Sequence, residues 1–140
     1  MSLKGIGNGL AALIGLGIIF IGVRFLLAPE VAAAGFGLPA SAAGDAGAYL
    51  TAKGVRDIVS GLFVLVLLAS GQTRALGLVL LVASLIPLGD MAVVLAHTGP
   101  PSIAFGVHGV TAVTVLLDAY LLLDGDRRRR HLAPAPQPMH

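Results

Sequence analysis

The chain has 140 residues, of which 56% are hydrophobic and only 11% are charged, whereas soluble domains carry about 25% charged residues. A soluble fold of this length must cover its surface with polar groups, so the composition argues against a soluble domain and indicates a protein embedded in a bilayer. The absence of cysteine excludes disulfides, thiolate metal sites and thiol nucleophiles. The net charge of +2 comes mostly from Arg127 to Arg130, so nucleic acid is not an expected partner.

Four apolar stretches are near the length of about 20 residues that a membrane helix requires. In chain order they cover residues 8–28, 47–69, 73–97 and 102–123. None alternates with a period of two, and a backbone in lipid must satisfy its own hydrogen bonds, so helices are predicted. The predicted fold is all-α, a four-helix transmembrane bundle. It forms a single domain over residues 1–126, followed by a basic, proline-rich tail over residues 127–140.

The first stretch has an alternative interpretation as a secretory signal peptide. Lys4, the apolar run and the small residues Val31 to Ala34 resemble such a signal with its cleavage zone, and cleavage would leave three spans. The run is long for the core of a signal and Arg24 interrupts its end, so a retained span is favoured. Six glycines between Gly5 and Gly22 give this span a small-residue surface suited to close helix contact.

Lysine and arginine in the short loops predict the orientation. Lys4, Arg74 and the four arginines of the tail fall on one side if the number of spans is even. The loops of the opposite side contain Glu30, Asp45 and His97 but no lysine or arginine. Both termini are therefore expected in the cytoplasm, and the chain is expected to be a multi-pass protein of the cell membrane.

Ionisable residues inside membrane helices cost several kcal/mol unless they are paired or hydrated, so they are candidates for function. The candidates are Arg24 in the first stretch, Lys53, Arg56 and Asp57 in the second, Asp90 in the third and His108 in the fourth. Counted from the ends predicted to be extracytoplasmic, they lie roughly 6 to 15 Å below that surface. We therefore expect all four helices to contribute to one polar layer. Spacings of three and four residues place Tyr49 and Ser60 on the same helix stripe as Lys53.

This layer contains three cations, two carboxylates and one imidazole, which leaves about one positive charge after pairing. It could bind an anionic or strongly polar head group, or supply an acid and a base for proton transfer. The predicted catalytic residues are Asp57, Asp90 and His108. The predicted substrate-binding residues are Tyr49, Lys53, Arg56 and Arg24. No cofactor is expected, because such chemistry needs none.

The same residues also have structural interpretations, which remain open. Arg24 and Lys53 could extend to the interface, Asp90 could bond a helix end loosened by Pro87, and His108 could be a satisfied buried histidine. Arg56 and Asp57 could only set helix register. Asp118 lies near the cytoplasmic end, where Arg74 or the tail would be its partner. A metal held by Asp90, His97 and His108 is conceivable but is not the prediction.

Several motifs together resemble a known family. They are Gly35-Phe36-Gly37-Leu38-Pro39, Tyr49-Leu50-x-x-Lys53-Gly54-x-Arg56-Asp57-x-x-x-Gly61, Pro87-x-Gly89-Asp90 and His108-Gly109. The pattern is similar to that of domain-of-unknown-function family 4267, small four-span membrane proteins, over roughly residues 13–122. The resemblance supports the fold and the cluster but implies no reaction. The architecture is more loosely similar to DoxX-like four-helix families and to membrane isomerases and cyclases, by analogy only.

Three functions remain in competition. The first is a membrane protein that binds a lipophilic small molecule with a polar end and isomerises or cyclises it, or opens an epoxide, by acid/base chemistry. The second is a small proton-coupled transporter acting as a homo-oligomer, which the one-sided position of the layer disfavours. The third is an accessory membrane subunit whose charges select a partner.

Overall fold

The computed structural model describes residues 3–39 and 46–132, with side chains as far as Arg128. Within these ranges the chain is helical and contains no strand, which confirms the all-α prediction. Asp45 and residues 133–140 of the predicted tail lie outside the described residues.

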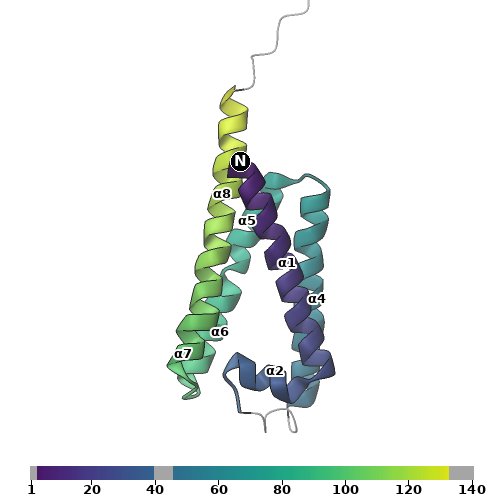
Figure 1. Cartoon of the computed structure of the whole chain (residues 1–140), viewed down its shortest axis with the longest axis vertical. Coiled ribbons are helices and arrows are strands. Elements are labelled where there is room, and N and C mark those ends of the chain that lie inside the picture. The colour runs from purple at the N-terminus through teal and green to yellow at the C-terminus, as the bar shows by residue number, and fades with distance from the viewer. Residues whose placement is uncertain (1–2, 40–45, 133–140) are drawn as a thin grey trace, which may run out of the picture.

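The long helices run side by side along the long axis of the molecule (Figure 1). In chain order the elements are α1 (Leu3–Leu27), α2 (Pro29–Phe36), α4 (Gly47–Ala69), α5 (Thr73–Ala83), α6 (Leu85–Ala96), α7 (Pro101–Ile103), the π-helix η1 (Ala104–Gly109) and α8 (Val110–Leu132). The start of α1 and the last turns of α8 lie at the same end, and α2 lies across the other end.

Three helical segments are long and apolar enough to cross a membrane. They are Leu3–Leu27, Thr73–Ala96 and Pro101–Arg128. Their outward faces carry exposed apolar side chains such as Leu13, Val82 and Val113, each about two-thirds exposed. These features indicate a membrane protein. Helix α4 has the predicted bounds, but every part of it long enough to cross a bilayer includes three charged residues, so it does not belong to this group.

Helix α2 was not predicted. Pro29 stands at its first turn, where the missing N–H costs nothing and the fixed φ suits a helix. Gly37 ends it with a left-handed φ of 98° and donates its N–H to the carbonyl of Ala34 at 3.1 Å. The segment proposed as a cleavage zone, Val31 to Ala34, is part of this helix. Its Ala33 is fully buried.

The helix that contains the fourth stretch is longer than the predicted span of residues 102–123. Helix α8 continues beyond the Asp124-Gly125-Asp126 sequence to Leu132, so the first residues of the predicted tail are helical. One glycine inside a helix costs only about 1 kcal/mol. Nε of Arg128 donates to Oδ2 of Asp124 at 2.7 Å, one turn away. This ion pair stabilises the last turns of α8. Positive charge near the C-terminus of a helix also stabilises it, through the helix dipole.

Glycines set the distance between α1 and α4. A Cβ on Gly22 would lie 2.6 Å from the carbonyl oxygen of Gly54, and a Cβ on Gly61 would lie 2.5 Å from that of Gly15. In each helix the two contact glycines are seven residues apart, so two turns of each helix bring backbone against backbone. The predicted small-residue surface of the first stretch therefore packs against glycines of α4.

Two separate clusters of buried side chains hold the helices together. The first, near the chain termini, joins α1, α4, α5 and α8 and contains Ala11, Val64, Leu76, Leu80, Val115, Ala119 and Leu122. The second lies at the α2 end and contains Phe25, Ala32, Ala33 and Leu50. The space between them along the molecular axis is not filled by either cluster, and it forms the cavity described below.

Among the residues whose side chains are described, Asp118 has neither Arg74 nor a residue of the tail as a partner. It is fully buried, and neither carboxylate oxygen has a hydrogen-bond partner among the described residues. Arg74 is exposed, and Gly7 of α1 stands beside the carboxylate, where a Cβ would lie 3.4 Å from Oδ1. A buried polar group without a partner lowers stability by about 1–3 kcal/mol.

Asp118→Leu is therefore expected to raise the free energy of unfolding by about 1 kcal/mol or more, because leucine has the same branched shape without the unsatisfied oxygens. Thermal unfolding in detergent, followed by circular dichroism, measures the change. Asp124→Leu is the matched control: Asp124 is partly exposed and its ion pair lies at the surface, so its change should be within about 0.5 kcal/mol. A loss of stability in Asp118→Leu would contradict the interpretation.

Candidate functional site

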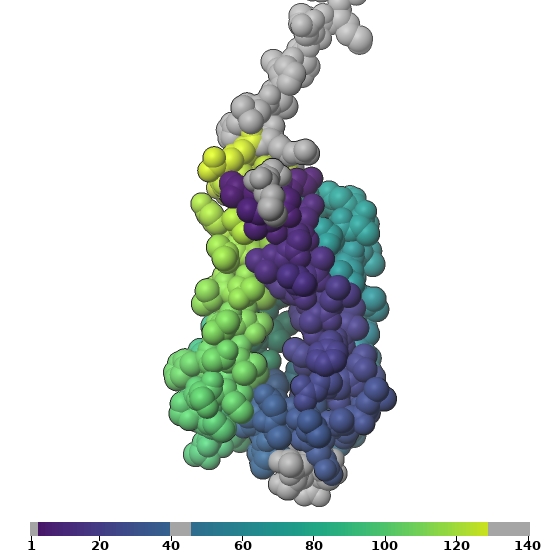
Figure 2. All heavy atoms as spheres, viewed as in Figure 1, coloured from purple at the N-terminus to yellow at the C-terminus, as the bar shows by residue number. Residues whose placement is uncertain are grey.

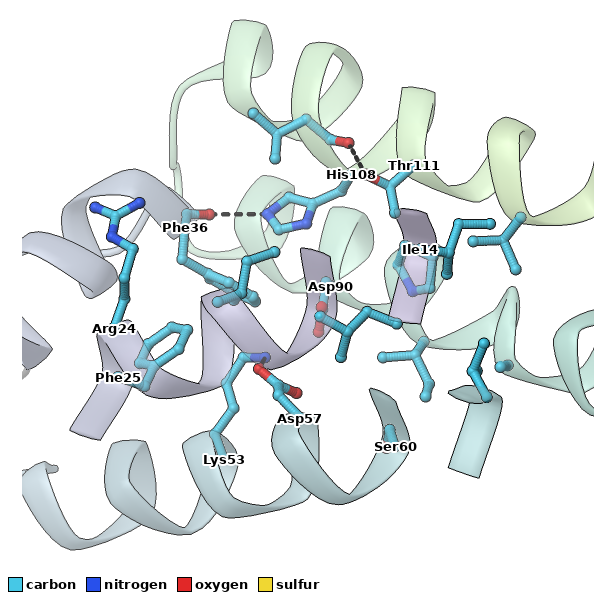
Figure 3. A pocket seen from close by; sticks show the side chains of 18 of the residues that line it. Ile14, Arg24, Phe25, Phe36, Lys53, Asp57, Ser60, Asp90, His108 and Thr111 are labelled. Atoms are coloured by element: carbon cyan, nitrogen blue, oxygen red, sulfur yellow. Dashed lines mark hydrogen bonds and ion pairs between the residues drawn. The ribbon is translucent and has the colours of Figure 1, made fainter. Parts of the chain in front are cut away.

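A cavity of about 510 Å³ lies between the two buried clusters (Figure 3). Drug-sized ligands occupy cavities of about 300–1,000 Å³. The wall of the cavity is formed by residues of α1, α2, α4, α5, α6, η1 and α8, and most of the wall is apolar. The charged and titratable residues in the wall are Arg24, Lys53, Asp57, Asp90 and His108. The structure thus brings five of the seven predicted site residues to one wall, at the end toward α2.

Lys53 and Asp57 form an ion pair on α4. Nζ of Lys53 lies 2.8 Å from Oδ2 of Asp57, and the two residues are one helical turn apart. The same Nζ lies 5.0 Å from the ring centroids of both Phe25 and Phe36. An ammonium near two aromatic faces is stabilised by the ring quadrupoles, the more so where water is scarce. The lysine is therefore held in the wall and does not extend to the membrane surface.

His108 joins η1 to α2. Its Nε2 lies 2.9 Å from the carbonyl oxygen of Phe36, and its ring stands edge-on to the Phe36 ring at 4.5 Å (Figure 3). A carbonyl oxygen only accepts, so Nε2 carries the proton and Nδ1 of the neutral ring is an acceptor. Nδ1 makes no hydrogen bond with any described residue. His108 is thus oriented by α2 and retains one basic nitrogen.

The backbone that carries His108 is a π-helix, Ala104–Gly109. Such segments are rare and occur frequently at functional sites, because the wider turn redirects one side chain. Gly106 and Gly109 lie on either side of the histidine within this segment. Thr111 follows, and its hydroxyl donates to the carbonyl of Val107 at 2.7 Å, a bond that threonine commonly makes to its own helix.

Asp90 stands in the cavity wall on α6, three residues after Pro87. Its carboxylate makes no hydrogen bond or ion pair with the described residues. Lys53, His108 and Asp57 are the ionisable groups whose fields act on it. Asp90 therefore does not form the hydrogen bond to a loosened helix end that was the structural alternative. Pro87 lacks an N–H and follows the interruption at Ser84 between α5 and α6.

Arg24 contributes to the wall from the last turn of α1. One guanidinium nitrogen, Nη2, would lie 3.9 Å from a Cβ at Gly35, so the head group is beside α2 (Figure 3). No ion pair or hydrogen bond of Arg24 occurs within the described ranges.

Tyr49 and Arg56 are not part of the cavity wall, so their predicted place in the cluster was wrong. Tyr49 is 80% exposed and Arg56 is exposed on the outer face of α4. Successive residues of an α-helix are about 100° apart. Asp57 is therefore rotated about 100° from Arg56. Tyr49 and Arg56 lie at the exposed edge of the stripe that contains Lys53 and Ser60, and the cavity is on the other side of that stripe. Sequence adjacency to Asp57 concealed this difference.

The alternative metal site is also absent. In the part of the chain that the structure describes, no three histidine, aspartate or glutamate side chains are grouped to hold a metal ion. His97 is exposed at the end of α6, and its Nδ1 lies 3.0 Å from the carbonyl of Val93. It is therefore separate from the cavity that Asp90 and His108 line.

Two aromatic residues of the site were missed by the reasoning on charges. Phe25 and Phe36 contact each other edge-on at 6.1 Å and flank Lys53. The Pro29 start and the Gly37 end of α2 were the sequence features that could have revealed this element, and with it the position of Phe36.

Comparison with known protein families matches residues 15–122 to the family described as Domain of unknown function (DUF4267). The match covers more than half of the chain. The chain belongs to this family. No curated protein and no solved structure matches it. The match includes every charged and titratable residue of the cavity wall, from Arg24 to His108, so the cavity lies within the DUF4267 domain. The family description names no activity, and function has to be argued from the cavity.

Proposed function

We propose that this DUF4267 protein is a four-span protein of the cell membrane, with both termini in the cytoplasm, and that its cavity binds a lipophilic small molecule with a polar end. The single observation that carries the proposal is one cavity with an apolar wall and a polar group of residues at one end. The apolar wall suits the lipophilic part of such a molecule, and the polar group of residues suits its polar end. The match in size to drug-sized ligands supports it.

The cavity opens sideways, which supports entry from the bilayer. Ile21 of α1 and Val107 of η1 both line the cavity, yet they are 44% and 46% exposed. In Figure 2 a hollow separates the lower half of α1 from η1 and the start of α8. The two buried clusters close the cavity along the molecular axis. A lateral opening favours a ligand that dissolves in lipid, and it disfavours a transport path across the membrane.

The polar end of the cavity has the groups that acid/base chemistry requires. Nδ1 of His108 would accept a proton from the ligand, and the resulting imidazolium would return a proton at another position, which is an isomerisation that needs no cofactor. The Lys53 ammonium, held by Asp57, would donate a hydrogen bond to the ligand oxygen and fix the position of the ligand's polar end. Arg24 would assist it from α1.

Ligand binding is tested by native mass spectrometry of the protein purified in a mild detergent. We expect a lipophilic molecule to be retained by the wild-type protein and to be reduced at least about tenfold in a triple variant, Asp57→Asn, Asp90→Asn and His108→Ala, since several polar contacts are lost. His97→Ala is the control, because His97 is exposed and outside the cavity. Equal retention in the triple variant would refute the proposal.

The four-span topology is tested with single cysteines, because the chain has none of its own. Glu30→Cys on α2 and Gln72→Cys before α5 stand at opposite ends of α4, and both positions are exposed. A membrane-impermeant maleimide should label Glu30→Cys on intact cells, and should label Gln72→Cys only after permeabilisation. Labelling of both from the same side would show that α4 does not cross.

One observation favours a second candidate, an accessory subunit. Arg56 is exposed on the outer face of α4, and no described residue forms a hydrogen bond or ion pair with it. A charge on an outer face at membrane depth is costly without a partner. Under this alternative a second protein would co-purify and Arg56→Leu would release it, whereas ligand retention would not depend on Asp57, Asp90 and His108.

A further inference from the structure

The charges that line the cavity cancel. In the formal count, Arg24 and Lys53 contribute two positive charges and Asp57 and Asp90 contribute two negative ones, and the neutral imidazole of His108 adds none. The single positive charge left over in the sequence count came from Arg56, which is outside the cavity. A charged ligand would bring an uncompensated charge into a site of low dielectric, and that is unfavourable. The wall therefore suits an uncharged ligand.

The hydrogen-bonding capacity of the wall is unfilled in both directions. Nζ of Lys53 has three N–H groups, of which the contact with Asp57 uses one. Nδ1 of His108 and the carboxylate of Asp90 are acceptors that make no hydrogen bond within the described residues. A ligand that satisfies this wall must accept a hydrogen bond and also donate one.

From these two properties we infer that the ligand is an uncharged lipophilic alcohol, an inference that rests on the proposed function. Its hydroxyl oxygen accepts from Lys53, and its proton is donated to His108 Nδ1 or to Asp90. An ether or a ketone can only accept, so it would leave both acceptors unpaired. A carboxylate accepts but adds a negative charge beside Asp57 and Asp90.

The apolar part of the alcohol extends toward the chain termini. From His108 to Val115, both in the wall, seven residues of helix span about 10 Å, and from Arg24 to Ile14 ten residues span about 15 Å. All the charged residues of the wall are at the α2 end, and Ile14, Leu80 and Val115 form its far end. The hydroxyl and the hydrocarbon chain thus have separate places, and the gap between α1 and η1 admits the molecule from the bilayer.

The test uses probes that share one hydrocarbon chain and differ at the head. The protein is reconstituted in nanodiscs with equal amounts of 1-dodecanol, methyl undecyl ether, dodecanoate or dodecane, and the retained probe is measured by native mass spectrometry. We expect 1-dodecanol to be retained about tenfold more than the ether, because one donated hydrogen bond to a buried acceptor distinguishes them. Dodecanoate should be retained less than the alcohol, and dodecane least.

Two variants examine the acceptors. His108→Gln keeps an N–H that can reach the Phe36 carbonyl and removes Nδ1, so the alcohol-to-ether ratio should fall below about threefold. Asp90→Ala removes the second acceptor without changing α2 and should lower the same ratio. The matched control is His97→Gln, the same substitution at an exposed histidine outside the cavity, and its ratio should equal that of the wild type.

The outcomes separate this inference from the proposed function. If dodecanoate or the ether is retained as well as the alcohol, the inference is overturned while lipophile binding stands. If no probe is retained but a co-purified lipophile is, the alcohol class is again wrong and the proposed function stands. If neither a probe nor a co-purified lipophile is retained, the proposed function itself fails.

Discussion

Gly61→Ala is expected to lower the free energy of unfolding by about 3 kcal/mol, the upper part of the usual range for overpacking. The new Cβ would lie 2.5 Å from the Gly15 carbonyl oxygen and 2.6 Å from Cγ1 of Ile19. A side chain can rotate away from such a contact, but the backbone oxygen cannot, so α1 and α4 must separate. Because α1 carries Arg24 and α4 carries Lys53 and Asp57, ligand retention should be lost together with stability.

Gly17→Ala is the matched control for this change. Gly17 belongs to the same helix as Gly15, and a Cβ placed on it would meet nothing within 4 Å. Alanine in a helix is favoured over glycine by about 0.5–1 kcal/mol, so this variant should be as stable as the wild type or more stable. Thermal unfolding in detergent measures both variants. Equal behaviour of the two would show that α1 and α4 do not meet at their glycines.

Lys53→Met is expected to destabilise the protein by about 3 kcal/mol and to abolish ligand retention. Methionine preserves the apolar stem between Phe25 and Phe36, but it leaves the Asp57 carboxylate without its partner at 2.8 Å. Removing one member of a buried ion pair costs about 3–5 kcal/mol. The side chains of this pair are 25% and 16% exposed, so the lower part of that range applies.

The double variant Lys53→Met with Asp57→Leu separates folding from function. Removing both charges eliminates the unpaired carboxylate, and replacement of buried ion pairs by apolar residues is often neutral or stabilising. We therefore expect stability to return to within about 1 kcal/mol of the wild type while ligand retention stays lost. Recovery of retention in the double variant would show that the pair only supports the fold. Thermal unfolding and native mass spectrometry on the same preparations give the two readouts.

The helical character of the chain was predictable because it follows from local properties. Long apolar runs must satisfy their own backbone hydrogen bonds in lipid, so the bounds of α4 agree with the predicted 47–69. The residues of the cluster could be nominated for the same reason, since a charge inside an apolar run is conspicuous by composition alone. Helix α2 was not predicted, because an eight-residue segment of mostly small side chains has no distinctive apolar periodicity.

Composition and periodicity thus determined that this protein is helical, apolar on its outside and equipped with charges inside its apolar runs. Tertiary packing alone decided which charges face one another. The Gly22–Gly54 and Gly15–Gly61 contacts set the rotation of α4 against α1, directing Lys53 and Asp57 inward and leaving Arg56 outside. That rotation removes one positive charge from the cavity wall. Helix rotation depends on contacts between segments distant in sequence, and counting residues along one helix cannot reveal them.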